Sequence, residues 1–282
     1  MSKVAIVTDS TAYIPKNLLE QYPITVIPQV LVWGPETLRD GVDIQPVEFY
    51  TRLAKTTVMP STSQASPADF EKVFRSLLAQ GYEVLAITLS SLLSGTMDSA
   101  IQAKAALEGQ PIELFDSQTT AMAMGFQVLA AAKAAARGAS LAECKAVAEA
   151  ARGRTGVIIT FETLEFLHRG GRIGGAQRYL ASALNIKPIL ELTGGVLEPV
   201  EKVRTRRKAL ARLVELLGER TGGQKPMRIS CLHANSRQDA EYLLEQVKST
   251  YQVIEGTVTD VSPVIGTHAG PGTVGICWMI ED

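Results

Sequence analysis

Hydroxyl side chains gather where a strand-like run gives way to a helix. Ser94, Gly95 and Thr96 follow the apolar run Glu83–Leu89 and open the helical pattern of Thr96–Leu107. The first N–H groups of a helix lack partners within the helix and carry partial positive charge, and hydroxyls add further donors. This turn is therefore predicted to bind a small anionic group, a carboxylate or a phosphate.

Two further loops repeat this chemistry. Thr8–Thr11 follows the first apolar run of the chain, and Ser61–Gln64 precedes another helical pattern. Each hydroxyl taken singly could simply cap its helix, but several loops together favour one shared anion site. Because these loops contain no Lys or Arg, the anion is expected to be held by hydroxyls and backbone N–H groups. That environment suits a carboxylate at least as well as a multiply charged phosphate.

Two basic segments stand apart from these loops. His168–Gly175 carries three cationic or ionisable side chains among four glycines, which favours contact with phosphates or a partner over a plain flexible turn. Lys202–Arg212 carries six cationic side chains. This second cluster is either a solvated helix face or a docking face for an acidic partner, a nucleotide phosphate or an anionic membrane surface.

A second glycine-rich segment, Gly266–Gly275, contains His268 and a formal G-x-G-x-x-G pattern. The pattern runs into a predicted strand and contains Pro271, which argues against a dinucleotide-binding turn. Its glycines are expected to let the backbone approach a ligand or another loop. His268 is either a turn histidine bonded to a backbone carbonyl or a ligand-binding residue.

The first half of the chain alternates strand and helix signals. In the clearest helix, Ser66 and Pro67 begin an apolar stripe that Gly81 ends. This alternation predicts a mostly parallel sheet flanked by helices. The predicted strands are Val4–Thr8, Thr25–Trp33, Glu83–Leu89 and Ile112–Phe115, and the predicted helices are Pro15–Tyr22, Ser66–Gln80, Thr96–Leu107, Ala121–Arg137 and Leu141–Arg152.

The second half is different, because Gly194-Gly195 between two apolar runs predicts a hairpin among strand–helix units. We therefore predict a two-domain α/β protein, with an N-terminal domain at 1–158 and a C-terminal α/β domain with a mixed sheet at 159–282. The strands expected there are Gly156–Thr160, Lys187–Leu192, Val196–Val200, Met227–Leu232, Val253–Val258 and Thr273–Ile280, and the helical segments are Thr163–Leu167, Ala176–Leu184, Thr205–Glu219 and Ser236–Ser249.

Composition narrows the function classes. A net charge of −1 and an aromatic share of 6% argue against nucleic-acid binding. The three cysteines are far apart in the 282-residue chain and form neither a disulfide framework nor a metal motif. With no secretory or membrane-spanning pattern, a cytoplasmic protein is expected. No nucleotide-binding or metal motif is present, so no cofactor is expected.

Several motifs together resemble the DegV family of bacterial fatty-acid-binding proteins, in order from end to end. They are Val-Thr-Asp-Ser-Thr (7–11), Ser-Thr-Ser-Gln (61–64), Leu-Ser-Gly-Thr (93–96), Phe-Asp-Ser (115–117), Leu-His-Arg-Gly-Gly-Arg-Ile (167–173), Glu-Lys-Val-Arg-Thr-Arg (201–206) and Gly-Thr-His-Ala-Gly-Pro-Gly (266–272).

The resemblance implies a two-domain α/β protein that buries one long-chain fatty acid, such as palmitate. Its carboxylate would be held by the hydroxyls of Thr62 and Ser94, with Ser61 and Gly95 beside them and His268 organising the network. The family usually has Pro where this chain has Ala65. That departure is expected to loosen the loop of Thr62 without removing a donor. Side chains expected to line an acyl tunnel, or else to form ordinary helix core, are Met122, Met124, Phe126 and Leu129.

The family also implies a partner, the ATP-binding subunit of a two-component fatty acid kinase. Arg169, Arg172 and Arg204 would dock this subunit, which would phosphorylate the bound acid for phospholipid synthesis. The chain itself would then be a lipid-binding subunit and not an enzyme. The basic clusters would also suit transient contact with a membrane surface.

Two other functions fit parts of the sequence. A stand-alone serine-type esterase or acyltransferase would use Ser94 and His268, with Asp9 completing a triad. A DNA-binding regulator would use the face of Arg204–Arg212, but the near-zero net charge and the lack of a helix-turn-helix pattern count against it.

Overall fold

The computed structural model describes residues 3–182 and 186–281. Its strands are β1 (Lys3–Asp9), β2 (Ile24–Ile27), β3 (Val30–Trp33), β4 (Glu36–Arg39), β5 (Ser61–Ser63), β6 (Tyr82–Thr88), β7 (Ile112–Asp116), β8 (Thr155–Thr160), β9 (Lys187–Thr193), β10 (Val196–Val203), β11 (Met227–His233), β12 (Val253–Asp260) and β13 (Val274–Ile280).

The α-helices are α1 (Lys16–Gln21), α2 (Pro46–Leu53), α3 (Pro67–Ala79), α4 (Thr96–Ala105), α5 (Ala121–Ala136), α6 (Leu141–Arg152), α7 (Glu165–Arg169), α8 (Arg206–Thr221), α9 (Arg237–Thr250) and α10 (Pro263–Ala269). Two 3-10 helices are η1 (Ser10–Ala12) and η2 (Gly174–Ser182). The end of the predicted helix Ala176–Leu184, at residues 183 and 184, lies outside the described residues.

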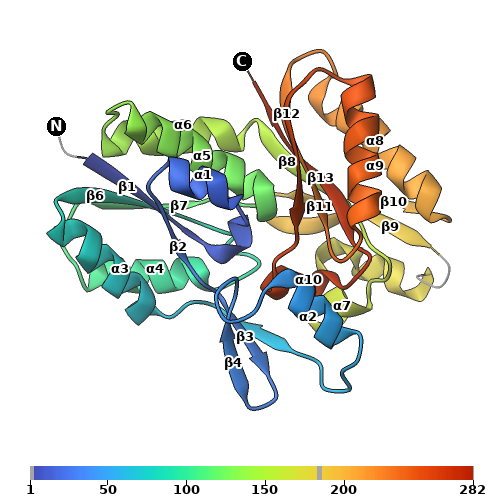
Figure 1. Cartoon of the computed structure of the whole chain (residues 1–282), viewed down its shortest axis with the longest axis horizontal. Helices are drawn as coiled ribbons and strands as arrows, with labels where there is room; N and C mark the ends of the chain where they lie inside the picture. Colours follow the sequence, from blue (N-terminus) through green and yellow to red (C-terminus); the bar gives the residue numbers. More distant parts are fainter. Residues whose placement is uncertain (1–2, 183–185, 282) are drawn as a thin grey trace.

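The N-terminal half forms the predicted parallel sheet. Its strand order is β2-β1-β6-β7, and every neighbouring pair is parallel. Helices α3 and α4 cover one face, and α5 and α6 cover the other (Figure 1). The cap of α3 is as expected, because Ser66 and Asp69 form a reciprocal capping box and Pro67 takes the first helical position. Loops that follow the strands therefore meet at one rim of the sheet.

The C-terminal half forms the predicted mixed sheet, in the order β10-β9-β8-β13-β11-β12. Only β11 and β12 pair in parallel among its described neighbours. The β9–β10 hairpin turns at Gly194 and Gly195, which both have positive φ, as the sequence predicts. Helices α8 and α9 pack on the outer face of this sheet (Figure 1).

A third sheet was not predicted. The run Thr25–Trp33, expected as one strand, is divided at Pro28 because proline cannot donate to a strand ladder. Strand β2 stays in the parallel sheet, whereas β3 enters an antiparallel sheet of order β4-β3-β5. These short strands and helix α2 carry too few residues to show a period in the sequence.

Helix α5 lies between the two large sheets and contacts β1 as well as β8 and β13. Eleven of its sixteen residues are buried, and apolar side chains cover all its faces. A helix that is apolar all round must be enclosed, so its composition matches its position. The predicted boundary between residues 158 and 159 lies inside β8, which belongs wholly to the six-stranded sheet.

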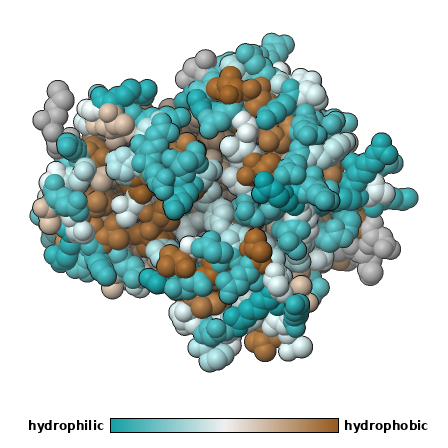
Figure 2. Space-filling model, viewed as in Figure 1, coloured by the Kyte–Doolittle hydropathy of each residue, from teal (hydrophilic) through white to brown (hydrophobic). Residues whose placement is uncertain are grey.

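The surface in the view of Figure 2 is mostly hydrophilic, with hydrophobic groups gathered in a few patches, the broadest on the left over the N-terminal half. Among the described residues, no helix combines the length and hydrophobicity needed to span a bilayer.

Candidate functional site

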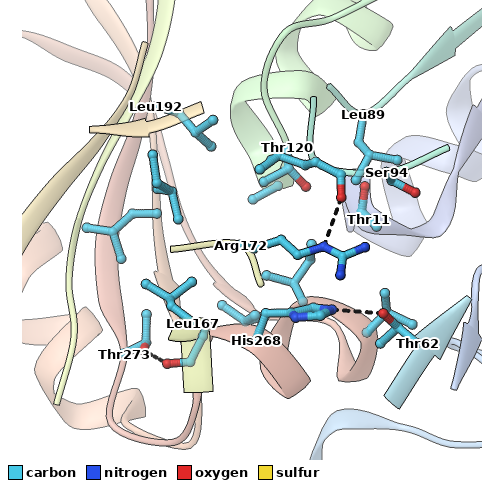
Figure 3. Close-up of a pocket in the computed structure, with 18 of the residues that line it drawn as sticks. Thr11, Thr62, Leu89, Ser94, Thr120, Leu167, Arg172, Leu192, His268 and Thr273 are labelled. Atoms are coloured by element: carbon cyan, nitrogen blue, oxygen red, sulfur yellow. Dashed lines mark hydrogen bonds between the residues drawn. The ribbon is translucent and has the colours of Figure 1, made fainter. Parts of the chain in front are cut away.

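A cavity lies between the rim of the parallel sheet and the inner face of the six-stranded sheet. Its empty space is about 920 Å³, with the open mouth included. Figure 3 shows two different ends. Thr11, Thr62, Ser94 and Arg172 gather on one side, whereas Leu192 stands on the other. The cavity therefore combines a polar end with an apolar wall, which is the form of a site for an amphipathic small molecule.

The polar end is built by loops that the sequence predicts to converge. Thr11 comes from η1 after β1, Ser94 from the turn before α4, and Thr62 from β5. Thr120 comes from the turn before α5 and was not singled out in the sequence. The rim of the sheet thus supplies the hydroxyls, as expected, but the edge strand β5 of the small sheet supplies Thr62.

His268 joins this end from the short helix α10, not from the loop that the sequence predicts. Ser262 caps α10 and Pro263 occupies its first turn, so the glycines of this segment did not prevent a helix. The Nε2 atom of His268 lies 2.8 Å from Thr62 Oγ1. On its other side Gly170 packs so closely that any side chain there would clash with Nδ1, which has no hydrogen-bond partner among the described residues.

The imidazole of His268 is neutral near pH 7. Burial lowers its pKa to about 4, and the positive charge of Arg172 adds to the effect. A neutral imidazole donates from one nitrogen only. In the tautomer that carries its proton on Nε2, His268 donates to Thr62 and leaves the Thr62 hydroxyl proton free to face the cavity, whereas in the other tautomer Thr62 donates to Nε2.

Ser94 is positioned by a buried chain of hydrogen bonds. Its Oγ lies 2.9 Å from Thr96 Oγ1, which accepts a hydrogen bond of 2.9 Å from Gln29 Nε2. Gln29 Oε1 accepts from the backbone N–H of Ala65 at 2.9 Å. The expectation that Ala65 loosens this loop is therefore wrong, because its N–H, which a proline would lack, ties the loop to Gln29.

The hydroxyls that line the cavity differ in whether a proton remains for a ligand. Thr11 donates to Asp9, Thr273 to the carbonyl of Ala269, and Ser63 to the carbonyl of Gln64. Thr62 and Ser94 each make a contact in which either partner can be the donor, and the Oγ1 of the buried Thr120 has no partner in the described structure.

Arg172 lines the same cavity, so the expectation of an anion site without cations is wrong. Its Nε donates to the carbonyl of Leu93 at 3.1 Å and its Nη1 to the carbonyl of Gly170 at 2.7 Å. Nearby, Ser90 Oγ donates to the carbonyl of Gly195 at 2.7 Å. Hydrogen bonds with two segments of the C-terminal half thus hold the loop that carries Ser94 in place.

A second, outer cavity adjoins the first and shares Thr62, Arg172 and His268 with it. Ser61 and Arg169 line only this outer cavity. Gly95, at the N-terminal cap of α4, lines neither cavity among the described residues, and a Cβ there would lie 3.1 Å from the amide of Gln64. Thr62, Arg172 and His268 therefore form a polar wall between the two cavities, and Ser61 and Arg169 lie on its outer side.

The cationic cluster of Lys202–Arg212 is remote from this wall and not uniform. Arg204 is exposed in the turn before α8, with no ion pair in the described structure. Arg212 is bound to three carboxylates, and Arg206 pairs with Asp239. Two of the six cations of the basic face proposed for a DNA-binding regulator are therefore paired with carboxylates.

Much of the apolar wall comes from the six-stranded sheet, and α5 contributes only Ala121 among the described residues. Met122, Phe126 and Leu129 line a different cleft beside α1, and all four side chains, Met124 included, are buried in the hydrophobic core, so they form helix core and do not line this cavity. The acyl-sized wall is instead formed by Val157, Ile159, Leu192, Leu197 and Leu232.

A serine-protease-like triad is not formed. Ser94 bonds to Thr96, His268 to Thr62, and Asp9 accepts from Thr11 and from the backbone of Leu89. A nucleophile needs the base within hydrogen-bond reach, which is not the arrangement here. Within 3–182 and 186–281, no cluster of three or more His, Cys, Asp or Glu could hold a metal ion.

Comparison with known proteins gives a consistent result. The model of the DegV family, described as uncharacterised proteins, matches residues 3–281. The chain is 38% identical over 280 residues to Protein DegV of Bacillus subtilis, with 99% of both chains covered. The solved structure of that relative, described as a fatty acid binding protein, has a TM-score of 0.90 at 36% identity, with 100% of both chains covered.

Two other solved structures are similar. A Thermus thermophilus DegV family protein described by its fatty acid binding has a TM-score of 0.93 at 33% identity, covering 99% of this chain and 100% of that one. A stearic acid-binding protein from Eubacterium ventriosum has a TM-score of 0.88 at 25% identity, covering 99% and 98%. The two-sheet fold, the order of the motifs and the whole-length match together show that this chain belongs to the DegV family.

Proposed function

We propose that this protein binds one long-chain fatty acid in the inner cavity, with the carboxylate at the polar end and the acyl chain along the apolar wall. The observation that carries this proposal is a group of hydroxyls, on Thr62, Ser94 and Thr120, at one end of a wall of aliphatic side chains. The fatty acids bound by the similar solved structures support the same ligand class.

The polar end suits an ionised carboxylate. A carboxylate has four lone-pair positions and no proton, so it is satisfied by donors alone. Thr62 and Ser94 each supply one O–H, and His268 orients the first of them through Nε2. The guanidinium of Arg172 adds positive charge at the same end. Hydrogen bonds to a charged group are roughly twice as strong as neutral ones, which favours the acid over its esters.

The apolar wall suits the chain. Val157 and Ile159 come from β8, Leu192 and Leu197 from the hairpin, and Leu232 from β11. Burial contributes about 0.8 kcal/mol for each methylene group, so a long chain supplies most of the affinity. The carboxylate decides the orientation of the ligand and adds affinity through its hydrogen bonds.

The position of the carboxylate also suits phosphorylation by a separate subunit. Thr62, Arg172 and His268 separate the inner cavity from the outer one, where Ser61 and Arg169 lie. A carboxylate oxygen at this wall could attack the terminal phosphorus of ATP, with ADP leaving and an acyl phosphate remaining. This chain contains no phosphate-binding glycine loop with lysine, so the proposal assigns ATP to a kinase partner that docks on Arg169, Arg172 and Arg204.

The test is native mass spectrometry of the purified protein, followed by solvent extraction and identification of the lipid. The double variant Thr62→Ala with Ser94→Ala is the matched control, because both side chains are on the surface of the cavity and not in the core. We expect one fatty acid per wild-type chain, and much less in the control. A wild-type protein that binds no added palmitate would refute the proposal, and equal retention by the double variant would refute the site assignment.

A further inference from the structure

Gln29 is a buried polar residue that belongs to no motif recognised in the sequence. It lies between β2 and β3, directly after Pro28, with 2% of its surface exposed. Its side chain reaches both loops of the polar end, at Ala65 and at Thr96. One amide therefore joins the segment that carries Thr62 to the turn that carries Ser94.

The orientation of this amide is determined by its neighbours. The backbone N–H of Ala65 can only donate, so the oxygen of Gln29 must face it and the NH₂ group must face Thr96. Thr96 Oγ1 then accepts from Gln29. Thr96 is fully buried, and in the described structure the other partner of its hydroxyl is Ser94 Oγ, so its proton is donated to Ser94. Ser94 is left with a free proton for the cavity.

The backbone of Gln29 is fastened as well. Its N–H donates to Ser10 Oγ at 3.0 Å, and Ser10 Oγ in turn donates to Asp40 at 2.6 Å. Burial raises the pKa of the neighbouring carboxyl of Asp9, and Gln29 is among the hydrogen-bonding groups that oppose this rise. Because both the backbone and the side-chain amide of Gln29 are held by hydrogen bonds, the amide cannot reverse its orientation, and the direction of the hydrogen bonds is determined by the fold.

We propose that Gln29 is a positioning residue that determines ligand specificity, because the relay Gln29→Thr96→Ser94 makes Ser94 a hydrogen-bond donor and so selects an ionised carboxylate over a fatty alcohol of equal length. This inference rests on the proposed fatty acid binding. A carboxylate accepts from every donor at the polar end. An alcohol gains only neutral hydrogen bonds there, which are about half as strong, and its own proton has only the one remaining lone pair of Ser94 to bond to.

The substitution Gln29→Glu tests the direction of the relay with almost no change of shape. An ionised carboxylate at this position still accepts from Ala65, but it can only accept from Thr96. Thr96 must then donate to residue 29, and Ser94 must donate to Thr96. Ser94 would present a lone pair to the ligand, which repels a carboxylate and accepts from an alcohol.

The readout is the ratio of the dissociation constants of cetyl alcohol and palmitate, measured by calorimetry or by displacement of a fluorescent acid. At about pH 8 the ratio should fall by about 10-fold or more in Gln29→Glu. Protonation of the new side chain restores an O–H donor toward Thr96, so the ratio should recover as the pH is lowered toward about 6. Burial and the neighbouring Asp9 place the pKa of that side chain above its usual range.

Two further variants separate the relay from a general loss of structure. Thr96→Val cuts the relay without adding charge and should also lower the ratio, but at both pH values. Gln29→Met removes both side-chain hydrogen bonds, and its ratio should not recover at the lower pH. Thermal unfolding of each variant verifies that it is folded.

The outcomes are distinct. The relay would be overturned if folded Gln29→Glu or folded Thr96→Val kept the wild-type ratio of dissociation constants at about pH 8. It would also be overturned if the ratio depended on pH in the same way in Gln29→Met and in Gln29→Glu. Wild-type protein that binds neither palmitate nor cetyl alcohol would instead refute the proposed function itself.

Discussion

The hydroxyl of Thr62 and the imidazole of His268 are 206 residues apart in the chain and 2.8 Å apart in space. Thr62 lies on an edge strand of the small sheet, and His268 lies on α10, which contacts that sheet. The bond therefore joins the first and last parts of the chain at the polar end of the cavity. Any ligand held there depends on both halves being in place.

Replacing Thr62 by alanine should weaken palmitate binding by roughly 10- to 150-fold, since a hydrogen bond to a charged group contributes about 1.5–3 kcal/mol. Thr62→Ser keeps the hydroxyl and is the matched control, with affinity close to the wild type. Calorimetric titration of both variants with palmitate checks this. Equal affinities in the two variants would show that the methyl group, and not the hydroxyl, contributes to binding.

The low pKa of His268 makes folding stability depend on pH in a defined direction. The unfolded chain takes up a proton near pH 6.5, whereas the folded protein does so only near pH 4. Between these values the unfolded state binds more protons, so stability is lost as the pH falls, by up to about 3 kcal/mol. Urea unfolding at about pH 7 and about pH 4.5 should show that the stability of the wild type relative to His268→Gln falls by this amount between the two pH values. A loss of equal size in both proteins would place its origin elsewhere.

The carboxyl of Asp40 makes folding stability depend on pH in the opposite direction to His268. Burial raises the pKa of its carboxyl to about 6, although a hydrogen bond from Ser10 opposes the rise. Its contribution to stability is complete below the unfolded pKa of 3.8 and is lost as the pH rises through 6. Asp40→Asn should therefore gain stability relative to the wild type above about pH 6, by up to about 3 kcal/mol. Unfolding curves across this range measure the difference, and a constant offset at every pH would contradict the assignment.

Arg172 and Arg204 should differ in what they affect. Arg172 lines the inner cavity, whereas Arg204 is exposed and remote from it. Arg204→Glu should leave palmitate affinity unchanged and lower phosphorylation by the kinase subunit. Arg172→Ala should lower both, because it removes positive charge from the polar end. Paired measurements of lipid affinity and acyl phosphate formation decide between these roles, and unchanged affinity in Arg172→Ala would return it to docking alone.

Much of the fold could be predicted because its long elements carry strong local signals. The capped stripe of α3 and the glycine turn between β9 and β10 show their structure within a few residues. The small sheet and α10 could not be predicted in the same way. Their strands and helix are short, and they are stabilised by contacts with segments far away in the chain.

The same contrast holds for the candidate site. Thr62 and Ser94 stand in hydroxyl-rich turns that can be recognised locally. Gln29 and Thr120 could not be found, because a single glutamine after a proline and a threonine before a helix are common in any sequence. Arg172 could be recognised as cationic, but its place in the cavity depends on how α7 packs against the loop of Leu93.

Helix α5 has a consequence for how the protein unfolds. Its buried faces serve the parallel sheet and the six-stranded sheet at once. If either sheet came apart, the helix would expose apolar surface that the other sheet alone cannot cover. Both halves should therefore melt in a single cooperative transition, although each has a hydrophobic core of its own.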